Sequence, residues 1–210
     1  MPARRTARAA RRRSPRKGDL TEQAILDTAE RLLAERPLSE IAIDELARGA
    51  GISRPSFYFY FESREAILRT LSERISEELY RSSQVWLRRV HESPAEAIRR
   101  ALEANVALWR EHGPVLRATV QASERDAEVR RFWDDVGRRF VDATAEQIER
   151  ERAAGLAPPT PPARSLASVL ITMNHQAFYQ ASLSRRSAKA YRELVDVLVT
   201  VWLRSVYGEG

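Results

Sequence analysis

The sequence predicts an all-α protein of about nine helices, in which an N-terminal helix-turn-helix segment precedes a C-terminal helical domain. Apolar residues recur at helical spacing through most of the 210 residues. Only 8 glycines are present, and long stretches contain no proline, so few positions interrupt a helix. A hydrophobic content of 43% fits a folded chain that buries a core.

Cysteine is absent from the sequence, which excludes disulfides, thiolate metal sites and cysteine nucleophiles. No apolar run approaches the roughly 18 residues that a membrane span requires. The N-terminus is basic, but no apolar segment follows it as in a secretory signal. The composition therefore predicts a cytoplasmic protein without a membrane partner.

Basic charge is concentrated at the N-terminus. The chain carries a net charge of +6, yet eight basic residues precede the first acidic residue, Asp19, so the remainder sums to −2. We expect residues 1–18 to form a disordered basic arm. Such an arm can follow DNA phosphates, with a binding strength that falls steeply with salt, or it can be a solvated tail that aids solubility.

Residues 19–80 are expected to form an N-terminal domain that opens with one amphipathic helix. Its apolar residues recur at helical intervals, and Asp19 with Glu22 matches the pattern of a capping box. Pro37 ends this helix, because proline lacks the backbone donor that a helix interior needs.

Three further helices complete this domain. Gly51 closes a short second helix, and a very short third helix covers about residues 53–60. Ser63 caps a long fourth helix. Its regular apolar spacing fades past Leu79, so the domain boundary is placed near residue 80.

Residues 81–210 are expected to form a second domain of five helices. Ser93 opens the first of them through a capping box, and Gly113 with Pro114 separates it from a shorter second helix. A proline-rich loop precedes the last two helices. The three remaining helices are expected at about residues 124–154, 163–184 and 187–207.

The last helix has an unusually wide apolar surface. Leu194, Leu198 and Val206 fall near one face, whereas Val197 and Val201 lie off that stripe. Such a helix needs cover on more than one side. It is either central in its own domain or paired with a second subunit.

The segment from Ile43 to Phe61 combines the demands of a helix-turn-helix. Ala47 is small enough for the second and third helices to cross closely, and Gly51 supplies a positive φ in the turn between them. Ile52 and Phe57 attach the third helix to the core. Hydroxyls and one guanidinium, suited to phosphate oxygens and base edges, remain exposed on Ser53, Arg54, Ser56, Tyr58 and Tyr60. Alternatively, the two tyrosines pack on the fourth helix with their hydroxyls in water.

This segment resembles the DNA-binding domain of the TetR family of bacterial transcriptional regulators. The likeness lies in Ile43-x-x-Leu-Ala-x-x-Ala-Gly-Ile-Ser53 and in Phe57-Tyr-x-Tyr-Phe-x-Ser-Arg-Glu65. A resemblance to an EthR-like subgroup lies in Arg54-Pro-Ser-Phe-Tyr-Phe-Tyr-Phe61, Met173-Asn174 and Ser205-Val-Tyr-Gly-Glu209; it extends over most of the chain and is weaker between residues 81 and 165. The resemblance implies a homodimer joined through the last two helices, a palindromic double-stranded DNA operator and repression relieved by a small apolar effector. The implied DNA contacts are Ile43, Ser53, Arg54, Ser56, Tyr58, Tyr60 and Arg64.

The same resemblance implies an effector cavity in the C-terminal domain. Its expected walls are Leu102, Val106, Trp109, Trp133, Gly137, Phe140, Thr144, Asn174, Phe178, Tyr179 and Trp202. Four of these, from Trp133 to Thr144, are spaced by four, three and four, so they share one helix face. The amide of Asn174 needs a hydrogen-bond partner, which is either a ligand carbonyl or a neighbouring backbone group. His175 stands where the subgroup has an acid, so the ligand can differ, although a lone histidine beside a core helix is usually structural.

Two other classes of function compete with this hypothesis. An enzyme would draw on His91, His112, His175 and scattered carboxylates, but these show no metal-ligand spacing, phosphate loop or nucleophile elbow, so no catalytic activity and no cofactor are expected. A non-specific DNA or anionic-membrane binder would work through the basic arm alone. That protein would lose binding when residues 1–18 are deleted and would not respond to changes at Ser53 or Tyr58.

Overall fold

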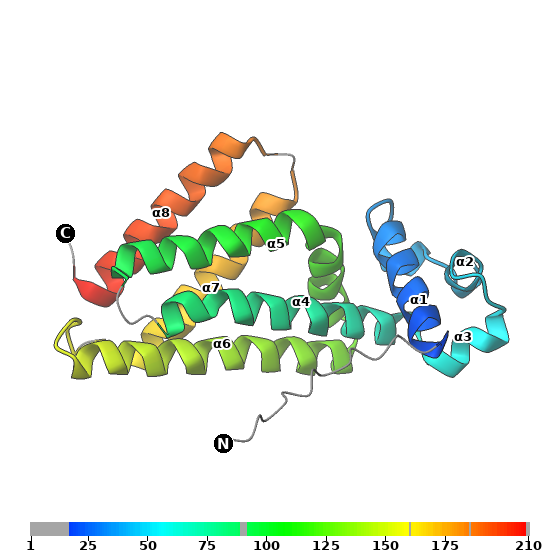
Figure 1. Cartoon of the computed structure of the whole chain (residues 1–210), viewed down its shortest axis with the longest axis horizontal. Coiled ribbons are helices and arrows are strands. Elements are labelled where there is room, and N and C mark those ends of the chain that lie inside the picture. The colour runs from blue at the N-terminus through cyan, green and yellow to red at the C-terminus, as the bar shows by residue number, and fades with distance from the viewer. Residues whose placement is uncertain (1–16, 89–91, 160, 185, 209–210) are drawn as a thin grey trace, which may run out of the picture.

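The structure is a computed structural model that describes residues 17–88, 92–159, 161–184 and 186–208. All of its regular elements in these ranges are helical, as the sequence predicts (Figure 1). They are α1 (Lys17–Leu33), the short 3₁₀ helix η1 (Leu38–Glu40), α2 (Ile43–Gly49), α3 (Arg54–Tyr60), α4 (Arg64–Leu87), α5 (Pro94–Ser123), α6 (Ala127–Ala153), α7 (Ala163–Ser182) and α8 (Ala188–Tyr207).

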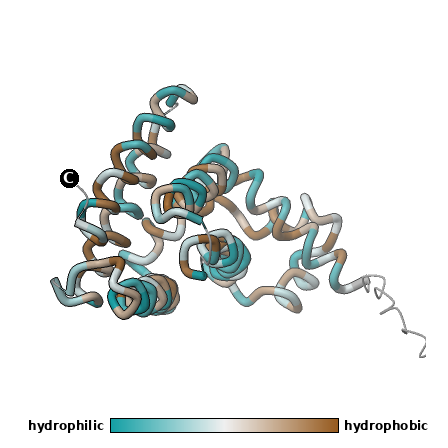
Figure 2. The backbone as a smooth tube through the Cα atoms, turned by 60° about the vertical axis from the view of Figure 1, so that its left-hand side comes forward, coloured by the Kyte–Doolittle hydropathy of each residue, from teal (hydrophilic) through white to brown (hydrophobic). Residues whose placement is uncertain are grey.

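Helices α1, α2 and α3 form a small head at one end of the molecule, and α4 leads from it into a larger helical body (Figure 1). Each helix carries a hydrophobic and a hydrophilic side, so brown and teal segments alternate along the tube in Figure 2. The apolar sides meet in the core, where Ile25, Leu26 and Phe57 of the head are fully buried. This burial is what holds such short helices in place, because isolated helices of this length are unstable in water.

The first helix begins earlier than predicted. Lys17 and Gly18 are already helical, so Asp19 lies in the first turn and is not the N-cap residue of a capping box. Its carboxylate still favours the helix there, because acidic groups interact well with the positive end of the helix dipole. The remainder of the predicted basic arm, residues 1–16, lies outside the described residues.

The predicted break at Gly113 and Pro114 is a kink within α5. His112 has non-helical backbone angles (φ −107°, ψ 16°), and Pro114 lies inside the helix. Proline removes one backbone hydrogen bond and bends the axis without ending the helix here, since apolar residues on both sides stay buried. The two predicted helices are therefore the two limbs of α5.

The fourth helix continues through residue 80 to Leu87 without interruption. Its first half carries Ile67, Leu68 and Leu71 into the core of the head, and Trp86 near its end is buried in the body. One rigid element thus connects head and body. The domain boundary near residue 80 stays a prediction.

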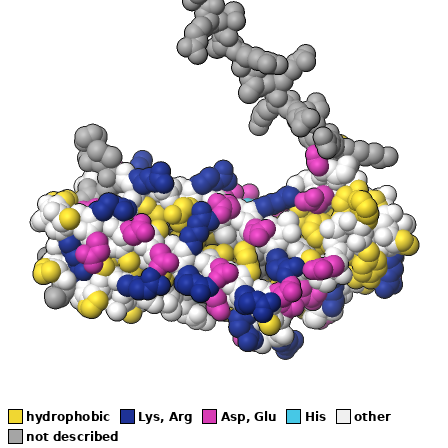
Figure 3. Space-filling view, turned by 90° about the horizontal axis from the view of Figure 1, so that it is seen from below, with side chains coloured by type: hydrophobic (Ala, Val, Ile, Leu, Met, Phe, Trp, Pro, Cys, Tyr) yellow, Lys and Arg dark blue, Asp and Glu magenta, His cyan; other side chains and the backbone are white. Residues whose placement is uncertain are grey.

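The body is built from α4 to α8, with α4 and α6 running side by side (Figure 1). Between these two helices the guanidinium of Arg139 lies 3.8 Å from the ring centroid of Tyr80 and pairs with Glu77. The Arg139 guanidinium lowers the pKa of Glu77 below its usual range, mainly through that hydrogen bond. Basic and acidic side chains are interspersed over the face drawn in Figure 3. Within the described ranges, none of the helices is long and apolar enough to cross a membrane.

Candidate nucleic-acid interface and ligand cavity

The turn between α2 and α3 has the geometry that the sequence predicts. Gly51 adopts a φ of +69°, which side chains other than glycine rarely tolerate. Ser53 is the N-cap of α3, since its Oγ accepts a hydrogen bond from the backbone N–H of Ser56 at 3.3 Å. Phe57 is fully buried behind the helix, and Ile52 packs against the same core. The local sequence therefore fixes which side of α3 faces away from the protein.

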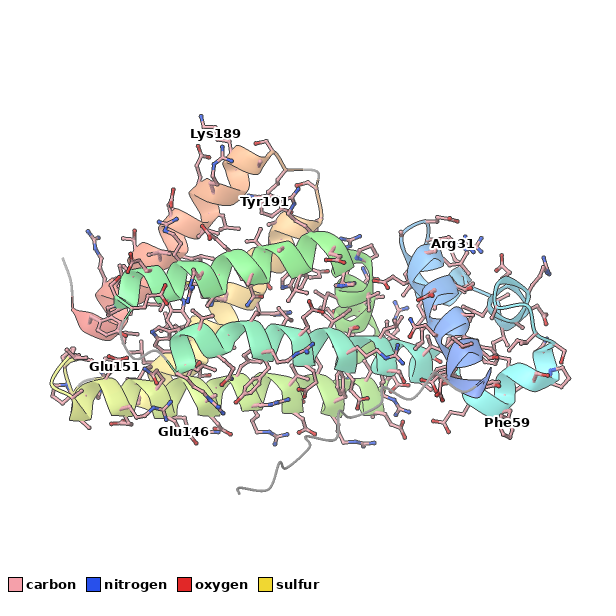
Figure 4. The ribbon with its side chains drawn as sticks, in the orientation of Figure 1. Arg31, Phe59, Glu146, Glu151, Lys189 and Tyr191 are labelled. Carbon is pink, nitrogen blue, oxygen red and sulfur yellow. The ribbon has the colours of Figure 1, made fainter. Side chains whose placement is uncertain are left out.

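The outward side of α3 is polar and aromatic. Ser53, Arg54 and Ser56 are exposed, the side chain of Tyr58 is 47% exposed, and that of Phe59 is 86% exposed. Phe59 stands at the end of the head, pointing away from the body (Figure 4). An aromatic side chain this open to water is unusual unless it meets a partner.

Phe59 was not among the residues that the sequence pattern singled out. The signal was nevertheless available: Phe57 and Phe61 are four residues apart and both buried, which turns Phe59 to the opposite side of the helix. Its exposed ring is suited to an apolar contact such as the methyl group of thymine.

Arg54 is held in place before any partner arrives. Its Nη1 donates to Asp44 Oδ2 of α2 at 3.2 Å. The nearby Tyr58 hydroxyl, together with the charge of Asp44, raises the pKa of Arg54 further above its already high value. The Arg54–Asp44 ion pair thus links α3 to α2 on the outward side of the head.

Three of the predicted DNA contacts lie closer to the protein core. Ile43 is half-buried and packs against the head core, as does Tyr60. Arg64 donates from Nη1 to the backbone carbonyls of residues 38, 39 and 41, each at 3.0 Å. Its guanidinium thereby ties the start of α4 to the loop before α2, and contact of these three residues with DNA stays a prediction.

A cavity of about 340 Å³ lies in the body between α4, α5, α6 and α7. Its wall is mostly apolar, with Trp109 on one side and Trp133 and Phe140 on another. Gly137 also lines it, and a Cβ atom added there would meet no atom within 4 Å. The glycine therefore borders open space, as a cavity explanation for its mid-helix position requires.

A second, smaller cavity of about 60 Å³ adjoins the first. The two share Asn105, Phe140, Ile171 and Asn174 as wall residues. At this shared wall the indole Nε1 of Trp202 donates a hydrogen bond to Asn174 Oδ1 at 3.1 Å. The Asn174 oxygen therefore has a side-chain partner, and pairing of the Asn174 N–H groups with a ligand carbonyl stays a prediction.

The structure brings nine of the eleven predicted wall residues to these two cavities. They are Leu102, Trp109, Trp133, Gly137, Phe140, Thr144, Asn174, Phe178 and Trp202. Val106 is buried in the core. Tyr179 lines neither cavity, and its ring centroid lies 6.5 Å from that of Trp109. Ligand contact by any of the eleven stays a prediction.

Sequence reasoning missed several wall residues, among them Asn105, Ile171 and His175. Ile171 and His175 lie four residues apart on α7 and therefore share a face with Phe178, a signal that helical spacing contains. The sequence left His175 open between a residue that changes the ligand and a structural residue beside the core. Its imidazole lies in the cavity wall, with burial lowering its pKa.

Other hollows of the described chain have more charged residues in their walls. The largest, of about 730 Å³, lies between the head and α6 and is bordered by Arg69 and Glu128, which pair with each other. Another, of about 440 Å³, runs between α4 and α6 near Arg88 and Glu146. Among the described residues no cluster of three or more His, Asp or Glu side chains could hold a metal ion. The mostly apolar cavity between α4, α5, α6 and α7 is thus the better candidate for a small organic ligand.

Comparison with protein families matches both parts of the chain. The family described as "Bacterial regulatory proteins, tetR family" matches residues 25–71, and "Transcriptional regulator EthR, C-terminal domain" matches residues 98–208. The chain is 37% identical over 204 residues to the HTH-type transcriptional regulator EthR of Mycobacterium tuberculosis strain H37Rv, covering 95% of this chain and 93% of that protein. It is 38% identical over 198 residues to EthR of Mycolicibacterium smegmatis, covering 94% and 91%.

Solved structures share the fold at low sequence identity. GusR of Salmonella enterica superposes with a TM-score of 0.72 at 17% identity, over 91% of this chain and 97% of that one. A transcriptional regulator from Saccharomonospora viridis in complex with choline gives a TM-score of 0.71 at 21% identity, over 87% and 95%. These similarities support the same arrangement of a helix-turn-helix head on a helical body.

Proposed function

Since the chain belongs to the TetR family of bacterial transcriptional regulators and to its EthR-like branch, we propose that it is a homodimeric repressor which binds a palindromic operator and is released by a small, mostly apolar ligand. Its relatives are DNA-binding regulators, not enzymes. The observation that carries the proposal is the outward side of α3, where Arg54 and Tyr58 are exposed on a helix whose opposite side is fixed in the core. A cytoplasmic location follows from this role.

Exposed apolar side chains support a dimer joined through α7 and α8. Val169 of α7 and Val197 of α8 are 66% and 60% exposed, and Leu183 at the end of α7 is 52% exposed. Of the off-stripe apolar residues of the last helix, Val197 is therefore left uncovered within one chain, whereas Val201 packs partly against the core. Cover by a second copy would bring two heads together, and a twofold axis between them matches a palindromic site.

The cavity supports control by a ligand. Because it lies between α4 and α7, and α4 reaches into the head, a molecule that changes the packing of α4 in the body also moves the head. A ligand that prefers the arrangement unable to bind DNA must lower the affinity for the operator. Bound operator must then lower the affinity for the ligand by the same factor. The S. viridis regulator holds choline, and our proposal extends small-molecule binding to this chain.

Operator affinity of two variants tests the DNA-binding part. The probe is a palindrome from the DNA upstream of the gene itself, titrated in a gel-shift assay at fixed salt. Arg54→Ala should weaken binding by about 10- to 100-fold, as expected for losing a guanidinium contact to a base or phosphate. Tyr58→Phe should weaken it by about 5- to 10-fold, the effect of one hydrogen bond.

Arg81→Ala is the matched control, because Arg81 is an exposed arginine of α4 that bonds only to the backbone of Glu77 among the described residues. It should leave binding unchanged. Unchanged affinity in both test variants, with binding lost only when residues 1–16 are removed, would instead favour the non-specific basic-arm binder.

A further inference from the structure

One polar group in the wall of the larger cavity lacks a partner. His175 Nε2 is buried and forms no hydrogen bond with any described residue. Its ring lies among three aromatic side chains, with centroid distances of 5.4 Å to Trp133, 5.8 Å to Trp109 and 6.5 Å to Tyr179. These rings pack around the imidazole, but none of them forms a hydrogen bond with Nε2. A buried polar atom in this state destabilises the protein that contains it.

Among the other polar side chains of the same wall, Asn174 is already engaged through its oxygen. Asn174 Oδ1 accepts the indole N–H of Trp202 at 3.1 Å, a bond that also stabilises the boundary between the two cavities. A ligand group that competed for this oxygen would leave the buried indole unpaired. The imidazole of His175 can accept a ligand group without breaking any bond of the protein.

Burial also lowers the pKa of His175 from its ordinary value, which favours the uncharged imidazole. The ionisable groups nearest to it in the cavity wall are Asp134 and Arg138, both on exposed positions of α6. One acid and one base at the rim give the cavity no net charge. An interior of this kind favours a neutral hydrogen-bonding group over an ion.

We propose that His175 is the polar anchor of the effector cavity, and that its ligand is an uncharged, mostly apolar molecule carrying one hydroxyl or amide group that hydrogen-bonds to the imidazole. The Cβ–Cγ torsion of histidine is soft, so the ring turns its nitrogen toward the hollow when such a molecule enters. A volume of about 340 Å³ suits a compact, ring-sized ligand. This inference rests on the proposed function in one respect: the ligand is an effector only if the protein is a regulator that the ligand releases from DNA.

A matched pair of probes tests the anchor. 4-Propylphenol and 4-propyltoluene have nearly the same shape, with a methyl group replacing the hydroxyl group in the second. The dissociation constants of both for the full chain are measured by titration calorimetry at pH 7.5. The wild-type protein should bind the phenol at least about tenfold more tightly, as expected for pairing one buried polar group. In His175→Phe this preference for the phenol should be lost, because its hydroxyl no longer has the imidazole as a partner.

Two further variants separate anchoring from a general effect on the cavity. His175→Gln restores a hydrogen-bonding group and should recover most of the preference for the phenol. His112→Gln is the control: His112 lines neither cavity and bonds to Glu30 through Nδ1 at 2.6 Å, so its replacement should leave the ratio unchanged. The ligand-free His175→Phe protein should also melt at a higher temperature than the wild type, because the unpaired nitrogen is gone.

An anionic probe checks the charge requirement. 4-Propylbenzoate should bind at least tenfold more weakly than the phenol to the wild-type protein, because a carboxylate loses its hydration in this cavity. All four tryptophans line one of the two cavities, so a change in tryptophan emission gives an independent measure of occupancy.

Three results would overturn the proposal: no detectable binding of the phenol, an equal phenol-to-toluene ratio in wild type and His175→Phe, or tighter binding of the benzoate. Operator binding by the same preparations is measured separately. A protein that shows the phenol preference but does not bind its upstream palindrome would refute the proposed repressor function and leave the anchor standing. The reverse result would refute the anchor alone.

Discussion

The head and the body of this protein are packed in opposite ways. In the head, Gly49 leaves no space: a Cβ added there would lie 2.4 Å from Thr28 Cγ2. In the body, a Cβ added at Gly137 would meet nothing within 4 Å. The head presents a fixed set of side chains to a partner of fixed geometry, whereas the body keeps space for a molecule to enter. The same residue type thus marks a close helix crossing in one region and a cavity in the other.

This difference has an energetic consequence. Empty space and an unpaired nitrogen both lower the stability of the body, because their neighbours lose contacts and hydrogen bonds. Such losses are tolerated at sites that must bind something. The head is tightly packed, and the DNA proposed as its partner binds at its surface. Substitutions in the two regions should therefore change the stability of the protein differently.

The largest expected difference comes from removing one aromatic ring in each region. Phe57→Ala should lower the free energy of unfolding by about 3–5 kcal/mol, because Phe57 is fully buried at the centre of the head. Phe140→Ala should cost roughly half as much, since Phe140 is only half-buried and already borders both cavities. Urea unfolding monitored by circular dichroism measures both. Equal losses would show that the body is packed as tightly as the head.

Adding one methyl group at Gly49 should have the next largest effect. Gly49→Ala places a methyl group against Thr28, a β-branched side chain that is 6% exposed and whose hydroxyl bonds to the backbone of Ala24. Because that side chain has little freedom to move, the substitution should destabilise the protein by about 1–3 kcal/mol despite the better helix propensity of alanine. The same urea titration measures it. Thr28→Ser supplies the missing space, so a double variant that is no more stable than Gly49→Ala would disprove the steric explanation.

The same change at Gly137 should act in the opposite direction. Gly137→Ala adds its methyl group to open space, so the helix gains about 1 kcal/mol from the propensity of alanine without a steric penalty. The melting temperature should rise accordingly. A fall would mean that the cavity around Gly137 is smaller in solution than the structure shows. Gly49→Ala and Gly137→Ala together form a matched test of the two packing regimes.

How much of this could be predicted from the sequence differs between the two regions. The head follows from local chemistry: Gly51, Ser53 and the spacing of Phe57 and Phe61 determine the turn, the cap and the buried side of α3. The body was predicted as helices, and most of its cavity wall followed from family resemblance. What could not be predicted was pairing across helices, such as Trp202 with Asn174, because helical spacing gives the face of a residue but not its partner.

His175 shows the same limit most clearly. Its position on α7 follows from spacing, but its unpaired state depends on three aromatic rings from two other helices and its own. A sequence pattern contains no record of a missing hydrogen bond. The structural interpretation of this histidine was therefore reasonable from the sequence, and the cavity changed it.

The smallest expected effect is a pH dependence that separates His175 from the rest of the chain. Because burial lowers its pKa in the folded state, the unfolded chain binds more protons once the pH falls below about 6.5, the ordinary value for histidine. Stability contributed by the neutral imidazole is present above that pH and is lost as the pH falls further.

Carboxylates with lowered pKa values, such as Glu45 with its bond from the Ala42 backbone and Glu77 with Arg139, also lose stability in acid. They are unchanged in His175→Phe, so the comparison isolates the histidine. Urea midpoints at pH 7.5, 6.0 and 5.0 should fall less steeply in His175→Phe than in the wild type. Identical slopes of urea midpoint against pH would mean that the imidazole is hydrated or paired in solution. The body would then lack the unpaired buried nitrogen that distinguishes it from the head.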